Sequence, residues 1–190
     1  RRFGEQAQAI LFAALVVLTI VAEIAMPWLV LALASGFEGE QFELAVLYSR
    51  IGFPYILFIS LTALYSGVLN SFGRFAAAAA APTLLNLTLI GAMLLAWRLD
   101  LDMGLSLTWS EVVAGILQLG LVLWAAHRIG MALKLRRPRL TPEMRRLVRV
   151  GIPGVLAGGV VQINLVVGEK VMIQMPTWFF PAGGGPYNLS

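Results

Sequence analysis

The chain has 190 residues, of which 59% are hydrophobic and only 13% are charged. Water-soluble domains carry about 25% charged residues, so these proportions exclude a soluble enzyme and predict a membrane protein. The sequence contains no Cys and one His, which excludes a disulfide framework, an iron–sulfur cluster and a multi-histidine metal site. The formal net charge of +4 indicates basic cytoplasmic loops and not a nucleic-acid partner.

Five apolar segments are long enough to cross a bilayer as helices of roughly 20 residues. Their length and their lack of period-two alternation exclude membrane β-strands. We therefore predict an all-α fold, a polytopic integral membrane helix bundle. The expected spans are residues 10–33, 51–69, 77–97, 105–126 and 150–167.

The first span contains a carboxylate, Glu23, and charge at the centre of a bilayer costs roughly 2.5–3.5 kcal/mol. In one interpretation Glu23 lines a polar cavity or couples transport to an ion. In the other, the span is shifted so that Glu23 lies near the outer headgroups, just before Pro27. The sequence leaves both interpretations open.

The later spans contain uncharged polar groups: Asn86 in the third, and Gln162 and Asn164 in the fifth. Such groups either hydrogen-bond to neighbouring helices or line a solute path. Thr108 lies near the start of the fourth span, and Glu111 follows three positions later, which predicts a capping box that opens this helix. Glu111 is then expected to lie at the outer interface.

Acidic and basic connections alternate along the chain, and this alternation predicts the orientation. The connection between the first two spans holds Glu38, Glu40 and Glu43 against Arg50. Segment 127–149, by contrast, holds eight basic residues against one acid. Because Lys and Arg gather on the cytoplasmic side, the N-terminus of this chain is expected in the cytoplasm.

Segment 127–149 is also predicted to contain a short amphipathic helix, which Thr141-Pro142-Glu143 would start. Arg145, Arg146 and Arg149 fall on one side of that helix. A basic amphipathic helix at the cytoplasmic interface binds anionic phospholipid headgroups, or it serves only as a topological anchor.

Three blocks of the sequence together resemble the MurJ (MviN) family. They are residues 50–61 (RIGFPYILFISL), 67–75 (GVLNSFGRF) and 81–86 (APTLLN). Weaker similarity extends the resemblance over about residues 1–168. The positions of these blocks that we assign a structural role are Pro54, Asn70, Arg74 and Pro82.

The resemblance implies a fragment of a fourteen-helix, two-lobe transporter in the bacterial inner membrane. Members of that family are lipid II flippases of the multidrug/oligosaccharidyl-lipid/polysaccharide exporter superfamily. They move an undecaprenyl-pyrophosphate-linked peptidoglycan precursor outward by alternating access, in cell-wall biosynthesis and without a cofactor. The family's substrate-binding arginines belong to segments that do not match this chain, so none is assigned here.

Residues 1–168 are expected to form the transmembrane bundle, whereas residues 169–190 form a Gly- and Pro-rich tail that departs from the family pattern. Both ends indicate a piece of a longer protein. The alternatives are another exporter of the same superfamily, which carries a different lipid-linked saccharide or a drug, and a non-transporting scaffold or remnant. An enzyme is disfavoured, because the sequence has no paired catalytic groups and no nucleotide-binding or hydrolase motif.

Overall fold

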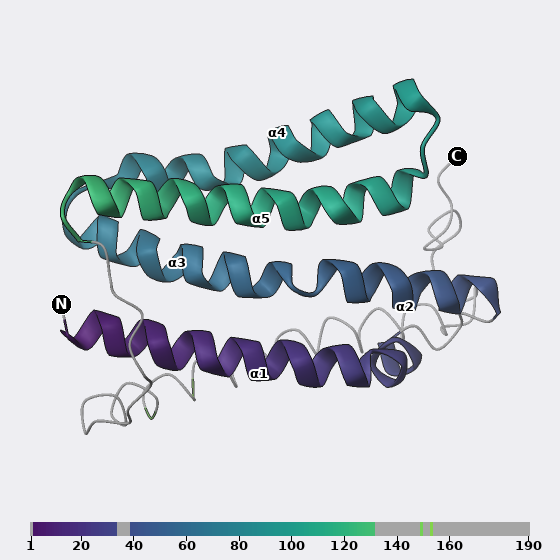
Figure 1. Cartoon of the computed structure of the whole chain (residues 1–190), viewed down its shortest axis with the longest axis horizontal. Coiled ribbons are helices and arrows are strands. Elements are labelled where there is room, and N and C mark those ends of the chain that lie inside the picture. The colour runs from purple at the N-terminus through teal and green to yellow at the C-terminus, as the bar shows by residue number, and fades with distance from the viewer. Residues whose placement is uncertain (1, 34–38, 132–148, 150–152, 154–190) are drawn as a thin grey trace, which may run out of the picture. The chain divides into compact units, whose positions relative to one another are not determined.

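The structure, a computed structural model, describes residues 2–33, 39–131, 149 and 153. Every element in this part of the chain is a helix, which confirms the all-α prediction (Figure 1). In chain order the helices are α1 (Arg2–Leu33), α2 (Glu40–Gly52), α3 (Tyr55–Ser71), α4 (Phe75–Leu99) and α5 (Met103–Arg128).

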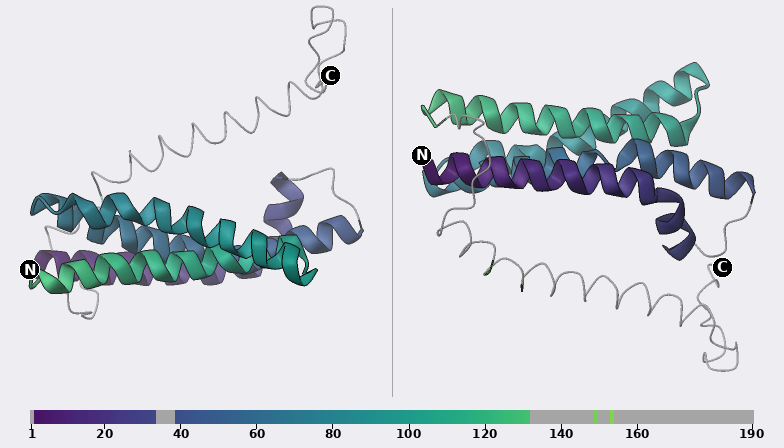
Figure 2. Two further views of the ribbon diagram at one scale, coloured as in Figure 1. Left: turned by 90° about the horizontal axis from the view of Figure 1, so that it is seen from above. Right: turned by 60° about the horizontal axis from the view of Figure 1, so that its bottom comes forward.

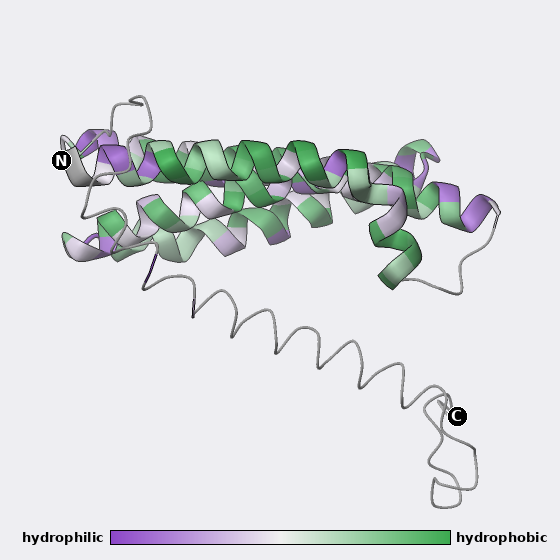
Figure 3. Cartoon of the chain, turned by 90° about the horizontal axis from the view of Figure 1, so that it is seen from below, coloured by the Kyte–Doolittle hydropathy of each residue, from purple (hydrophilic) through white to green (hydrophobic). Residues whose placement is uncertain are grey.

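Four helical stretches are long and apolar enough to cross a bilayer, which confirms a polytopic membrane protein. Apolar residues cover most of their length (Figure 3). The expected spans 10–33, 51–69, 77–97 and 105–126 each lie within one of these stretches. The predicted span 150–167 and the tail 169–190 lie outside the described residues, apart from Pro153. The four stretches are Gly4–Leu33, Glu40–Ser71, Phe75–Leu99 and Met103–Arg128.

Helix α1 contains Pro27, and its last turns point away from the axis of its longer first part (Figure 2). Proline has no N–H to donate within the helix, and its ring collides with the carbonyl group four residues earlier. A bend at this position is the expected consequence. The bend brings the end of α1 against α2, where Met26, Val30 and Val46 form a small buried cluster.

The second membrane-length stretch consists of two helices, α2 and α3, which follow one another in nearly the same direction (Figure 1). Pro54 precedes the first residue of α3 and interrupts the regular helix after Gly52. Residues 40–50, which the sequence analysis assigns to a connection, form most of α2. Glu40 and Glu43 lie in its first turn, where the helix dipole favours acidic groups.

Helix α5 begins earlier than the sequence analysis predicts, so the expected capping box is wrong. Asp102 is the N-cap, and its side chain accepts a hydrogen bond of 2.6 Å from the backbone N–H of Leu105. Thr108 lies inside the helix, where its hydroxyl donates to the Gly104 carbonyl at 2.8 Å. The reason is that Asp102, six residues before Thr108, already caps a free N–H group at the start of the helix, that of Leu105.

Asp102 also joins two helices, because its Oδ1 accepts a hydrogen bond of 3.1 Å from the Tyr48 hydroxyl of α2.

We expect Asp102→Ala to lower the free energy of unfolding by about 1 kcal/mol, which is the typical value of an N-cap. Denaturation of the detergent-solubilised chain with SDS, followed by circular dichroism, measures this change. Asp100→Asn is the matched control, since Asn tolerates the left-handed backbone of that position (φ 52°). Equal stability of Asp102→Ala and wild type would contradict the prediction.

Helix α5 packs against α2, α3 and α4 and is the central helix of this part of the chain. At one end of the contact between α3 and α5 lies a buried cluster, formed by Tyr65, Leu69, Val122 and Ala126. Many large apolar side chains on the outer faces of the helices are exposed, as expected for surfaces that meet lipid or further helices.

Candidate functional site

A buried amide at the middle of α5 links three helices. Gln118 is only 1% exposed, and its Nε2 donates a hydrogen bond of 2.7 Å to the carbonyl oxygen of Ala81 in α4. Its Oε1 accepts a hydrogen bond of 3.3 Å from the hydroxyl of Tyr55 in α3. Buried polar groups need such partners, because an unsatisfied one costs about 1–3 kcal/mol. We call these three residues the polar link.

The polar link depends on a glycine one turn earlier in α5. The ring of Tyr55 lies so close to Gly115 that a Cβ atom there would be 2.8 Å from Tyr55 Cδ2. The same Cβ would be 3.0 Å from Cβ of Phe58. Only glycine lets the Tyr55 hydroxyl reach Gln118 across this contact.

The polar link connects two of the blocks that carry the resemblance to the MurJ family. Tyr55 belongs to block 50–61 and Ala81 to block 81–86, which are separate in the sequence but meet at Gln118. Sequence reasoning missed Gln118. The available signal was an amide in the middle of an apolar span, three residues after a glycine on the same helical face.

A hollow of about 460 Å³ adjoins the polar link and is bordered by α1, α2, α3 and α5. Its wall contains one carboxylate, Glu111, and the side chains of Tyr48, Ser49, Tyr55 and Thr108. The capping role that the sequence analysis gives to Glu111 is therefore wrong, since the residue lies within α5 and faces this hollow. Carboxylate and hydroxyl groups there can accept and donate hydrogen bonds to a polar solute or to water.

Glu23 lies four residues, or about 6 Å along the helix, before the bend at Pro27. The residue is half-buried, and its Oε1 is buried with no hydrogen-bond partner among the described residues. It is not among the residues that line the hollow beside Glu111. The two interpretations of Glu23, a cavity wall and a place near the headgroups, both stay predictions.

Within the described residues, Glu23 has a buried oxygen without a partner, so an apolar residue there is expected to increase stability. We expect Glu23→Leu to raise the free energy of unfolding by about 1–3 kcal/mol, the usual cost of such a group. The SDS titration described for Asp102 measures the change. Glu43→Leu, at an exposed position in the first turn of α2, is the control and is expected to lower stability slightly. A loss of stability in Glu23→Leu would contradict this prediction and reveal a partner elsewhere in the chain.

The other predicted residues do not gather into one site. Asn86 and Asn70 are exposed on α4 and α3, while Pro54 and Pro82 lie at the start of α3 and inside α4. Arg74 is exposed in the turn before α4. Arg149 is helical and exposed, whereas Arg145, Arg146, Gln162 and Asn164 lie outside the described residues.

The four membrane-length helical stretches, three of which meet at the polar link, define a multi-pass helical membrane protein. A group of three or more His, Cys, Asp or Glu that could hold a metal ion does not occur in the part that the structure describes. The sequence profile of the family described as "Lipid II flippase MurJ" matches residues 1–172. The chain belongs to this family.

Similar proteins carry the same name. The chain is 44% identical to the "Probable lipid II flippase MurJ" of Rhizobium tropici over 177 residues, which are 90% of this chain and 33% of that protein. It is 40% identical to the protein of that name from Rhizobium meliloti, with the same coverage. It is 37% identical to the "Lipid II flippase MurJ" of Burkholderia cenocepacia over 85% of this chain and 33% of the relative. The chain thus spans about a third of the length of these relatives.

Proposed function

We propose that the chain is part of a lipid II flippase, which moves a lipid-linked peptidoglycan precursor across the bacterial inner membrane for cell-wall synthesis. The observation that carries this proposal is the match of residues 1–172 to the family of that name. The four membrane-length helices agree with it, because a flippase has to span the bilayer several times. The proposed activity is transport, with no covalent chemistry of its own.

In the whole transporter, two helical lobes rock around a central cavity that accepts an anionic headgroup. We assign residues 1–168 to the scaffold of one lobe, with the N-terminus of this chain in the cytoplasm. The close packing of α3, α4 and α5 around the polar link supports a lobe that moves as one body. Arg145, Arg146 and Arg149 are proposed to face the anionic phospholipids of the cytoplasmic leaflet.

Complementation tests this function. A full-length gene that encodes this chain is expressed in a bacterium depleted of its own lipid II flippase. We expect growth to be restored and lipid II to become accessible at the outer surface. Failure to restore growth, despite normal insertion into the membrane, would overturn the proposal and favour another exporter of the superfamily. The 190-residue chain alone is expected to restore nothing, since it spans only about a third of its relatives.

A further inference from the structure

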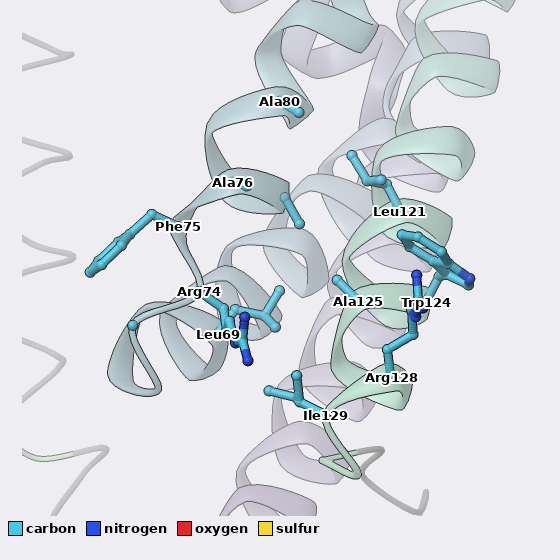
Figure 4. A pocket seen from close by; sticks show the side chains of 12 residues that line it. Leu69, Arg74, Phe75, Ala76, Ala80, Leu121, Trp124, Ala125, Arg128 and Ile129 are labelled. Atoms are coloured by element: carbon cyan, nitrogen blue, oxygen red, sulfur yellow. The ribbon is translucent and has the colours of Figure 1, made fainter.

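A second hollow, of about 790 Å³, lies where α3 ends, α4 begins and α5 ends (Figure 4). Its apolar wall is made of short alanine side chains of α4, together with Leu121 of α5. Phe75 and Trp124, both exposed, stand on its two sides. The small side chains of the alanine run leave space beside the turn that larger residues would fill.

Two arginines line this hollow, and none of the described residues that line it is acidic. Arg74 comes from the turn between α3 and α4, and Arg128 from the last turn of α5 (Figure 4). The Arg128 guanidinium lies 5.1 Å from the centroid of the Trp124 ring, which holds it in place by a cation–π contact. The site therefore offers two cationic groups beside an apolar wall.

The level of the hollow along the membrane-spanning helices matches the level of lipid headgroups. Three membrane-length stretches begin or end beside it, at Ser71, Phe75 and Arg128, so it lies at the level where the hydrocarbon gives way to headgroups. Trp and Arg are typical of this level, because the indole ring is amphipathic and the guanidinium binds phosphate through several N–H groups.

Two occupants of the hollow can be compared by their charge: the chain segment that follows it and an anionic lipid. The sequence that follows this hollow, residues 132–149, carries seven basic residues and one acid, so it does not complement Arg74 and Arg128. An anionic lipid complements both arginines, since its phosphate is opposite in charge to the guanidinium groups and its acyl chains can pack against the apolar wall. We propose that this hollow binds the phosphate of an anionic phospholipid. The inference rests on the geometry of the hollow and does not depend on the transported substrate.

Native mass spectrometry of the purified 190-residue chain in detergent tests the proposal, with phosphatidylglycerol and phosphatidylcholine of equal chain length as probes. We expect phosphatidylglycerol to bind preferentially. Combining Arg74→Gln with Arg128→Gln is expected to weaken its binding about 25-fold, taking about fivefold for each arginine near a membrane surface. Arg50→Gln, which removes an exposed arginine outside the hollow, is the matched control and should change binding little.

Combining Arg74→Lys with Arg128→Lys retains the charge and is expected to keep most of the binding, which separates charge from folding defects. Circular dichroism checks that each variant is helical. Equal binding of the two lipids, unchanged binding in the double Gln variant, or an equal loss in Arg50→Gln would each overturn the proposal. Displacement of phosphatidylglycerol by equimolar undecaprenyl diphosphate would also overturn it, because the site would then belong to the lipid-linked precursor.

Discussion

Replacing Gly115 with Val is expected to lower the free energy of unfolding by about 2–3 kcal/mol, near the upper end for an overpacked contact. The added Cβ would lie 2.8 Å from Tyr55 and 3.0 Å from the Cβ of Phe58, which is fixed to its helix backbone. Tyr55 cannot move aside without loss, because its hydroxyl is bonded to Gln118. SDS denaturation of the purified chain, followed by circular dichroism, measures the loss.

Gly120→Val is the matched control. It introduces the same side chain into the same helix, but a Cβ at Gly120 meets nothing within 4 Å. The difference between the two variants therefore isolates the contact with α3 from the helix propensity of valine. Gly115→Ala should lie between wild type and Gly115→Val. Equal stability of the Gly115 and Gly120 variants would show that α3 and α5 do not pack as described.

The membrane helices could be predicted from the sequence because the bilayer itself sets their length. A run of about 20 apolar residues has few alternatives in hydrocarbon, so the spans need no knowledge of packing. Their ends were less predictable. Asp102 and Thr108 both suit an N-cap, and only the three-dimensional structure decides that the earlier one is used.

Most of the candidate site could not be predicted from the sequence, because its contacts join residues that are far apart along the chain. Gln118 bonds to residues 63 and 37 positions away, and no local pattern specifies such partners. The resemblance to the MurJ family succeeded for a different reason, since its three blocks are specific strings of residues.

Replacing Gln118 with Leu is expected to cost about 1–3 kcal/mol of unfolding free energy, because the part-buried hydroxyl of Tyr55 then loses its acceptor. The bond to the Ala81 carbonyl is also lost, and at 2.7 Å it is the shorter of the two. The same SDS denaturation measures this cost. Gln41→Leu, at an exposed position of α2, is the control and should change stability by less than about 0.5 kcal/mol.

A second substitution separates the two hydrogen bonds of Gln118. Tyr55→Phe removes only the hydroxyl, so adding it to Gln118→Leu takes away the unpaired group that the first change leaves behind. The double variant is therefore expected to be more stable than the sum of the single losses predicts, by about 0.6 kcal/mol, the usual size of such couplings in membrane proteins. Strict additivity would mean that the 3.3 Å contact carries no energy, and that the bond to Ala81 alone explains why an amide lies at the centre of α5.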